Sequence, residues 1–188
     1  MKTAVYSGSF NPLHKGHIAI LEWLDSYPGV EQILLVVSPK NPLKDSIDED
    51  SAAQRFAAAK KAVVARSTSL SKVRVDDIEM RMSPPHYTIR TLDCLRKESP
   101  EKDFVLVVGA DNLATFHLWK DYARILLEYG LMVYPRSGYD AEADRSRLLA
   151  ENGAYRIEIM TGMNVDISST MIREAEAEGR DMSEYRAE

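Results

Sequence analysis

Short apolar runs alternate with longer segments of helical spacing along the chain. The segments 32–37 and 104–109 consist mainly of Val, Ile and Leu, which is typical of strands that are buried on both faces, as in parallel sheets. Further strands are predicted at 3–7, 73–75, 131–134 and 156–159. Helices are predicted around 18–24 and at 51–66, 88–97, 122–129, 141–152 and 168–179. This alternation predicts an α/β fold, a doubly wound parallel sheet with helices on both faces.

Length and composition indicate a single domain. The chain has 188 residues, of which 45% are hydrophobic and 28% are charged, and this is ordinary globular composition. No low-complexity linker divides it. We therefore interpret residues 1–188 as one domain that ends in a charged tail from about residue 180.

The charge balance argues against polyanionic partners. Lys and Arg number 24 against 29 Asp and Glu, a net charge of −5, so no overall positive field would hold nucleic acid or an anionic membrane. The single cysteine, Cys94, excludes an intramolecular disulfide framework and suits a reducing compartment. We expect a cytoplasmic protein that binds neither nucleic acid nor membrane. Its oligomeric state is left open.

The segment 8–17, GSFNPLHKGH, leaves the first predicted strand and opens the first predicted helix. Small residues at Gly8 and Ser9 let backbone N–H groups approach a ligand, and a helix N-terminus near His17 carries a partial positive charge that suits phosphate. His14 and His17 are three residues apart, so both imidazoles can point at one ligand and donate hydrogen bonds to phosphoryl oxygens.

A second candidate anion site lies at 166–173, DISSTMIR. Ser168 or Ser169 as helix N-cap would leave free N–H groups and hydroxyls at the helix start. Arg173, one turn into the helix, can bring a planar guanidinium to the same phosphates.

The buried run at 104–109 ends in Gly109-Ala110-Asp111, followed by Trp119. Ligands of open parallel sheets bind outside the carboxyl ends of the strands, which is where Asp111 falls. Its carboxylate could bind ribose hydroxyls or a metal-associated group, and Trp119 offers a flat face for a heteroaromatic ring.

Taken together, these segments resemble a known family. The H-x-G-H pattern of His14, Gly16 and His17 is similar to the signature of the nucleotidyltransferase superfamily, and the Ile-Ser-Ser-Thr-x-Ile-Arg stretch resembles the segment by which that family holds the ATP triphosphate. The VGADNL segment followed by Trp119 resembles the nicotinate mononucleotide adenylyltransferases. The resemblance implies a Rossmann-like sheet.

Two further loops resemble the same branch. The loop 38–44 is similar to a proline-lysine loop in which a lysine meets phosphate, with Lys44 as the candidate and Lys40 as the weaker one. Tyr87 and Thr88 match a stretch that approaches the pyridine substituent. Arg90 stands where that family usually has an aspartate, which leaves the preference between nicotinate and nicotinamide open.

The resemblance implies transfer of AMP from ATP to the 5′-phosphate of nicotinate mononucleotide, with release of pyrophosphate. His17 would bind the α-phosphoryl oxygens, and His14 and Arg173 the β and γ phosphates. Mg²⁺ would accompany ATP and need few direct protein ligands, so no residue is assigned to metal. The predicted ATP-binding residues are Gly8, Ser9, Phe10, His14, Gly16, His17, Gly109, Asp111, Ser168, Ser169, Thr170 and Arg173. The predicted residues for the mononucleotide are Asn11, Lys44, Tyr87, Thr88 and Trp119.

Alternatives remain at this point. The acceptor could be nicotinamide mononucleotide or another phosphomonoester such as phosphopantetheine, and a catalytically silent nucleotide-binding regulator would carry the same nucleotide-binding residues. A dinucleotide-dependent dehydrogenase is disfavoured because no Gly-x-Gly-x-x-Gly follows the first strand.

Overall fold

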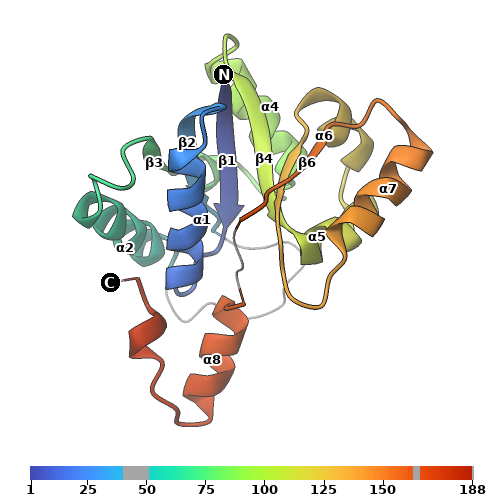
Figure 1. Ribbon diagram of the computed structural model, residues 1–188. Coiled ribbons are helices and arrows are strands. Elements are labelled where there is room, and N and C mark those ends of the chain that lie inside the picture. The colour runs from blue at the N-terminus through green and yellow to red at the C-terminus, as the bar shows by residue number, and fades with distance from the viewer. Residues whose placement is uncertain (40–50, 163–165, 188) are drawn as a thin grey trace.

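A six-stranded sheet forms the middle layer of the computed structural model, which describes residues 1–39, 51–162 and 166–187 (Figure 1). The strands are β1 Lys2–Gly8, β2 Val30–Val37, β3 Val73–Asp76, β4 Asp103–Gly109, β5 Leu131–Tyr134 and β6 Ile157–Ile159. They lie in the order β3-β2-β1-β4-β5-β6, and every neighbouring pair is parallel. The predicted doubly wound parallel sheet is confirmed.

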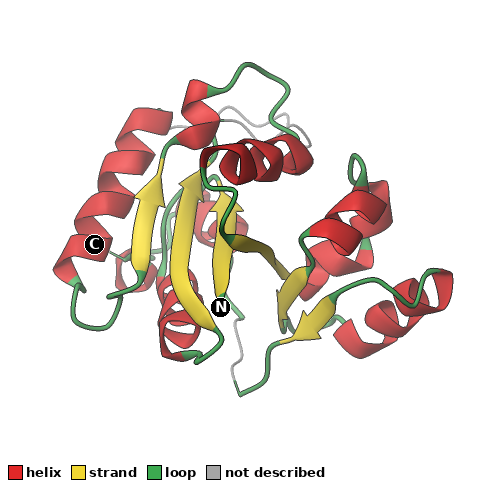
Figure 2. Cartoon of the chain, turned by 90° about the horizontal axis from the view of Figure 1, so that it is seen from above, coloured by secondary structure: helices red, strands yellow, loops and turns green. Residues whose placement is uncertain are grey.

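Helices cover both sides of this sheet (Figure 2). The longer helices are α1 Lys15–Ser26, α2 Ala52–Ala65, α4 Thr88–Glu98, α6 Tyr122–Glu128, α7 Ala141–Glu151 and α8 Ser169–Ala177. On one face, Leu21 and Leu24 of α1 pack with Ala59 of α2. On the other face, residues of α4, α6 and α7 form a second core. Because successive strand residues point to opposite faces, each inner strand must be apolar throughout, as the sequence pattern predicts.

Four short helical segments were not predicted from the sequence. They are α3 Ile78–Arg81, α5 Ala110–Ala114, and the 3-10 turns η1 Phe116–Leu118 and η2 Ser183–Tyr185. Segments of three to five residues are too short to show a 3.6-residue periodicity. None of the helices in the described parts of the chain combines the length and apolar character that a membrane span requires.

The charged tail packs against the start of α1. The N–H of Ala187 donates to the carbonyl of Leu13 at 3.1 Å, and Arg186 forms an isolated antiparallel bridge with His14. Arg186 also pairs with Glu176 of α8 at 2.9 Å. The last described residues therefore hold the helix start and α8 together.

A buried guanidinium ties α2 to the carboxyl ends of β1 and β2. Arg55 is 3% exposed and donates to the carbonyl oxygens of Ser9, of Ser38 at 2.8 Å and of Pro39 at 3.0 Å. Loop carbonyls at strand ends lack sheet partners, and a buried polar group without one is costly. Arg55 supplies these partners.

Replacing Arg55 by Met should therefore lower the free energy of unfolding by roughly 2–4 kcal/mol, because several buried carbonyls lose a charged donor. Urea denaturation followed by circular dichroism measures the change. Arg180→Met is the matched control: its guanidinium is 63% exposed and pairs only with an exposed carboxylate, so its effect should stay within about 0.5 kcal/mol. Equal effects of the two variants would contradict the assignment.

Candidate active site

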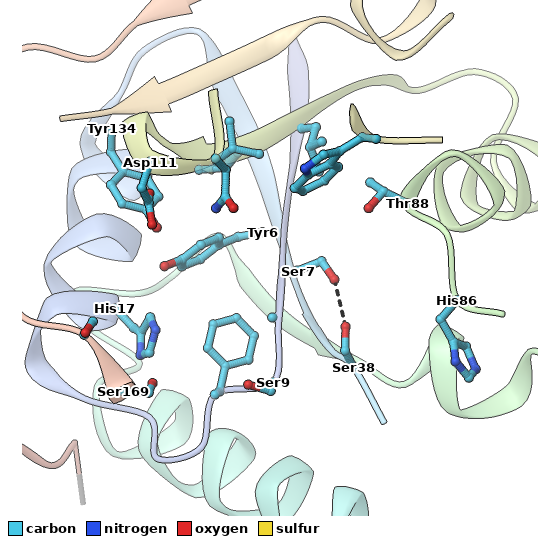
Figure 3. Close-up of a pocket in the computed structure, with 18 of the residues that line it drawn as sticks. Tyr6, Ser7, Ser9, His17, Ser38, His86, Thr88, Asp111, Tyr134 and Ser169 are labelled. Carbon is cyan, nitrogen blue, oxygen red and sulfur yellow. Dashed lines mark hydrogen bonds between the residues drawn. The ribbon is translucent and has the colours of Figure 1, made fainter. Parts of the chain in front are cut away.

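A cavity of about 690 Å³ lies at the carboxyl ends of the central strands. This is where open parallel sheets bind ligands, and the volume is within the range of small-molecule sites. Eleven of the predicted site residues line it: Gly8, Ser9, Phe10, His17, Tyr87, Thr88, Asp111, Trp119, Ser168, Ser169 and Thr170. Residues that are more than 150 positions apart thus share one cavity wall (Figure 3).

Of the other predicted residues that the structure describes, Asn11, His14, Gly16, Gly109 and Arg173 do not line the cavity. Lys44 and Lys40 lie outside the described residues, so the predicted lysine contact is not addressed.

The loop between β1 and α1 is held in a defined shape by its own side chains. Phe10 has a left-handed backbone with φ of +47°, a conformation that a residue with a large side chain rarely adopts. Its buried ring packs over Gly8, where a Cβ would approach the Phe10 ring to 3.2 Å. The ring also meets His17 edge-on, with centroids 4.9 Å apart. Gly8 therefore makes room for the aromatic residue that positions His17.

The two histidines of the loop are stacked, with ring centroids 3.6 Å apart. The backbone N–H of His14 donates to Nδ1 of His17 at 3.2 Å. Since Nδ1 of His17 accepts, the ring proton of the neutral imidazole is on Nε2. His14 itself is 1% exposed and lies behind His17, so in this arrangement only His17 faces the cavity.

Both imidazoles are neutral near pH 7. Burial, together with the positive charge of Arg136, lowers the pKa of His14 from 6.5 to about 4. Burial likewise holds the pKa of His17 well below its usual value, with added repulsion from His14 and Arg136. Two stacked rings beside a guanidinium cannot readily accept protons.

The N-terminus of α8 docks onto the same loop (Figure 1). The hydroxyl of Ser169 donates to the carbonyl of Pro12 at 3.1 Å, and Nη1 of Arg173 donates to the carbonyl of Asn11 at 2.6 Å. Ser168 is the N-cap, as predicted, and its hydroxyl accepts from the N–H of Met171 at 3.2 Å. The free N–H groups at the start of α8 therefore face the same cavity as His17.

A carboxylate and a guanidinium stand together at the ends of β4 and β5. Oδ1 of Asp111 lies 3.5 Å from Nε of Arg136, and neither of these two buried atoms has a hydrogen-bond partner among the described residues. Gly109 permits this approach, because a Cβ there would meet Oδ1 of Asp111 at 2.2 Å and the ring of Tyr134 at 3.0 Å. Both charged residues line the cavity.

Tyr87, Thr88 and Trp119 also line the cavity, and Thr88 lies away from His17 and Asp111 (Figure 3). The Trp119 ring rests on Phe116, with centroids 4.8 Å apart, which fixes its plane. Arg90 does not reach this region, since its exposed guanidinium donates to the carbonyl of Pro85 at 2.6 Å. Arg90 therefore offers no charge for choosing between a carboxylate and an amide.

Several lining residues were missed by the sequence analysis: Tyr6, Ser7, Ser38, Glu79, Tyr134 and Arg136. A signal for Arg136 did exist, because it follows a predicted strand whose carboxyl end meets the same edge of the sheet. Glu79 gave no such signal, since it lies in the short helix α3.

No group of three or more His, Cys, Asp or Glu side chains suited to a metal ion occurs in residues 1–39, 51–162 and 166–187. Among the described residues, the carboxylates that line the cavity are Asp111 and Glu79. A single carboxylate suits an ion that is held mainly by substrate phosphates, which is the usual mode of Mg²⁺.

Comparison with known proteins matches residues 5–175 to the cytidylyltransferase-like family model. A "probable nicotinate-nucleotide adenylyltransferase" of Bacteroides fragilis is 36% identical over 181 residues, which cover 96% of this chain and 85% of the relative. A relative with the same name in Azobacteroides pseudotrichonymphae is 34% identical over 188 residues, which cover 100% of this chain and 93% of the relative.

Solved structures share the fold. Nicotinic acid mononucleotide adenylyltransferase of Plasmodium falciparum in complex with NaAD matches with a TM-score of 0.77 at 19% identity, over 97% of this chain and 88% of that one. The same enzyme in complex with APC matches with a TM-score of 0.73 at 17% identity, over 97% and 87%. With the family model and the curated relatives, the chain belongs to the cytidylyltransferase-like family and, within it, to the nicotinate-nucleotide adenylyltransferases.

Proposed function

We propose that this protein transfers the AMP moiety of ATP to the 5′-phosphate of nicotinate mononucleotide, which yields deamido-NAD and pyrophosphate. The observation that carries the proposal is the neutral His17 imidazole, held with its Nε2 proton free, in one cavity with the N-terminus of α8 and Trp119. The family membership supports the same reaction. The mononucleotide phosphate is itself the nucleophile, so no covalent intermediate with the protein is required.

Catalysis would rest on positioning and on charge stabilisation at the α-phosphorus. His17 would donate from Nε2 to an α-phosphoryl oxygen, where negative charge accumulates during in-line attack. His14 would act from behind, through the N–H that fixes the ring of His17 and through ring stacking. The proposed contribution of His14 is therefore to orient the donor.

The triphosphate would lie between the starts of α1 and α8. Unpaired N–H groups at Ser169 and Thr170, with the partial positive charge of α8, would bind the β and γ phosphates. Arg136 and Lys120 line the same cavity and supply full charges. Arg173 would stabilise this arrangement by its hydrogen bond to Asn11.

A divalent cation such as Mg²⁺, bound together with ATP, would supply positive charge to the triphosphate. Asp111 fits a contact to such an ion or to a ribose hydroxyl, because its carboxylate lines the cavity and its side chain is partly exposed. The nicotinate ring would stack on Trp119, near Thr88 and Tyr87.

The first test is pyrophosphate release from ATP and Mg²⁺ with nicotinate mononucleotide, compared with nicotinamide mononucleotide at matched concentrations. We expect turnover with nicotinate mononucleotide and a kcat/KM at least about tenfold lower with the amide, since a site adapted to one polar substituent rejects the other. Phosphopantetheine is the control acceptor and should give no release. Release with phosphopantetheine alone would replace the proposed acceptor.

Replacing His17 by Ala should lower kcat by about 10²- to 10³-fold, by analogy with the loss of one transition-state donor. KM for ATP should change less, because the other phosphate contacts remain. His117→Ala is the matched control: this histidine is exposed and lies outside the cavity. Full turnover of the His17 variant would reject the proposed role.

The burial of His14 predicts a pH-dependent stability. Its folded pKa of about 4 lies below the value of about 6.5 expected in the unfolded chain. The unfolded state therefore binds more protons between these values, and stability is lost as pH falls from about 6.5 towards about 4. Between pH 7.5 and 4.5, the free energy of unfolding measured with urea should fall less for His14→Gln than for the wild type. Identical pH profiles would contradict the shift.

A further inference from the structure

Glu79 is a buried carboxylate that the mechanism above does not use. It lies in α3, is 3% exposed and still forms part of the cavity wall. Its oxygens accept hydrogen bonds from three hydroxyls: Ser7 at 3.1 Å, Ser38 at 2.5 Å and Thr91 at 3.0 Å. These hydroxyls come from the end of β1, the residue after β2, and α4. One carboxylate thus joins three elements that border the cavity.

The number of hydroxyl protons in this cluster determines where the hydroxyl protons of Ser7 and Ser38 point. Ser7 and Ser38 are 3.2 Å apart and each has one hydroxyl proton. Ser38 donates to Oε2 of Glu79, and Ser7 donates either to Oε1 or to Ser38. In both cases the two protons are used inside the cluster. Both serines also line the cavity, so towards a ligand they present lone pairs and no proton.

The cluster lies on the side of the cavity where the mononucleotide is proposed to bind. Ser7 and Ser38 stand on the side of Thr88 and His86, away from His17 and Ser169 (Figure 3). Thr91, which donates to Glu79, is one helical turn after Thr88. Glu79 is therefore linked directly to the helix whose start is proposed to meet the mononucleotide.

We propose that Glu79 is a positioning residue that turns Ser7 and Ser38 into hydrogen-bond acceptors for the ribose hydroxyls of the mononucleotide. This inference rests on the proposed function. The phosphate and the carboxylate of nicotinate mononucleotide are anions with no proton to donate, so lone pairs beside a buried carboxylate repel them. The 2′ and 3′ ribose hydroxyls of the mononucleotide, in contrast, have protons that they can donate to the oxygens of the two serines. The cluster thereby selects a ribonucleotide and sets which end of it faces His17.

The experiment compares the wild type with Glu79→Gln. A glutamine amide donates from its nitrogen to one serine oxygen, so that hydroxyl turns its proton towards the cavity. KM for nicotinate mononucleotide should rise about tenfold, the effect of losing a hydrogen bond. KM for ATP and kcat should stay within about threefold, because the phosphate-binding side is unchanged. Glu98→Gln, on an exposed carboxylate of α4, is the matched control and should match the wild type.

A second acceptor separates positioning from a general loss of structure. Against 2′,3′-dideoxy nicotinate mononucleotide, KM of the wild type should rise about tenfold, whereas the Glu79→Gln variant should lose less than about threefold, since its contact is already gone. If Glu79→Gln fails to fold, Ser7→Ala should give the same two signatures, because it removes one acceptor and keeps Glu79 hydrogen-bonded to the other two hydroxyls.

The outcomes distinguish the two proposals. An active wild type whose Glu79→Gln and Ser7→Ala variants keep the normal KM for the mononucleotide overturns the role of Glu79 alone. An equal rise in KM for the dideoxy mononucleotide in Glu79→Gln and in the wild type also overturns the role of Glu79 alone. A wild type that releases no pyrophosphate with either pyridine mononucleotide overturns the proposed function, and the role of Glu79 falls with it.

Discussion

The docking of α8 onto the loop after β1 is the contact on which the site depends. Ser169 and Arg173 donate to the carbonyl oxygens of Pro12 and Asn11, across 157 and 162 positions of the chain. Each bond satisfies a loop carbonyl that no sheet partner reaches. Together they bring the N-terminus of α8 beside that of α1, so the start of α8 and the side chain of His17 face one cavity.

This arrangement explains how a chain of net charge −5 can build an anion site. Helix N-termini attract phosphate with partial charges that are fixed by the backbone. The imidazoles add a hydrogen-bond donor without a full charge, because burial and Arg136 keep the pKa values of His14 and His17 low. Arg136 also lies close to Asp111, which limits the cost of holding a cation at a partly buried position. The site therefore gains its positive character without a dense cluster of lysines and arginines.

On the other side of the cavity, a buried carboxylate orients the surrounding hydroxyl groups. Glu79 is shielded from solvent and meets hydroxyls from three elements. Arg55, also buried, holds the backbone of Ser38 through its carbonyl oxygen. A buried anion and a buried cation thus act on the side chain and the backbone of one residue. Arg55 also donates to the carbonyl oxygen of Ser9 in the loop before α1, so this guanidinium links the two sides of the cavity.

The sequence by itself determined the layers of the fold and indicated two candidate phosphate-binding segments. Unbroken apolar runs specify strands covered on both faces, and the residues at 8–17 and 166–173 carry local signals for loops and helix starts. Only the tertiary structure decided which of those residues face the cavity. His14 and Arg173 do not line the cavity: His14 is stacked on His17, and Arg173 is bonded to the carbonyl of Asn11. Arg136 joins the site because β5 lies beside β4 in the sheet, and Glu79 joins it through hydrogen bonds to hydroxyls of distant segments. Such long-range contacts produce no periodic pattern in the sequence.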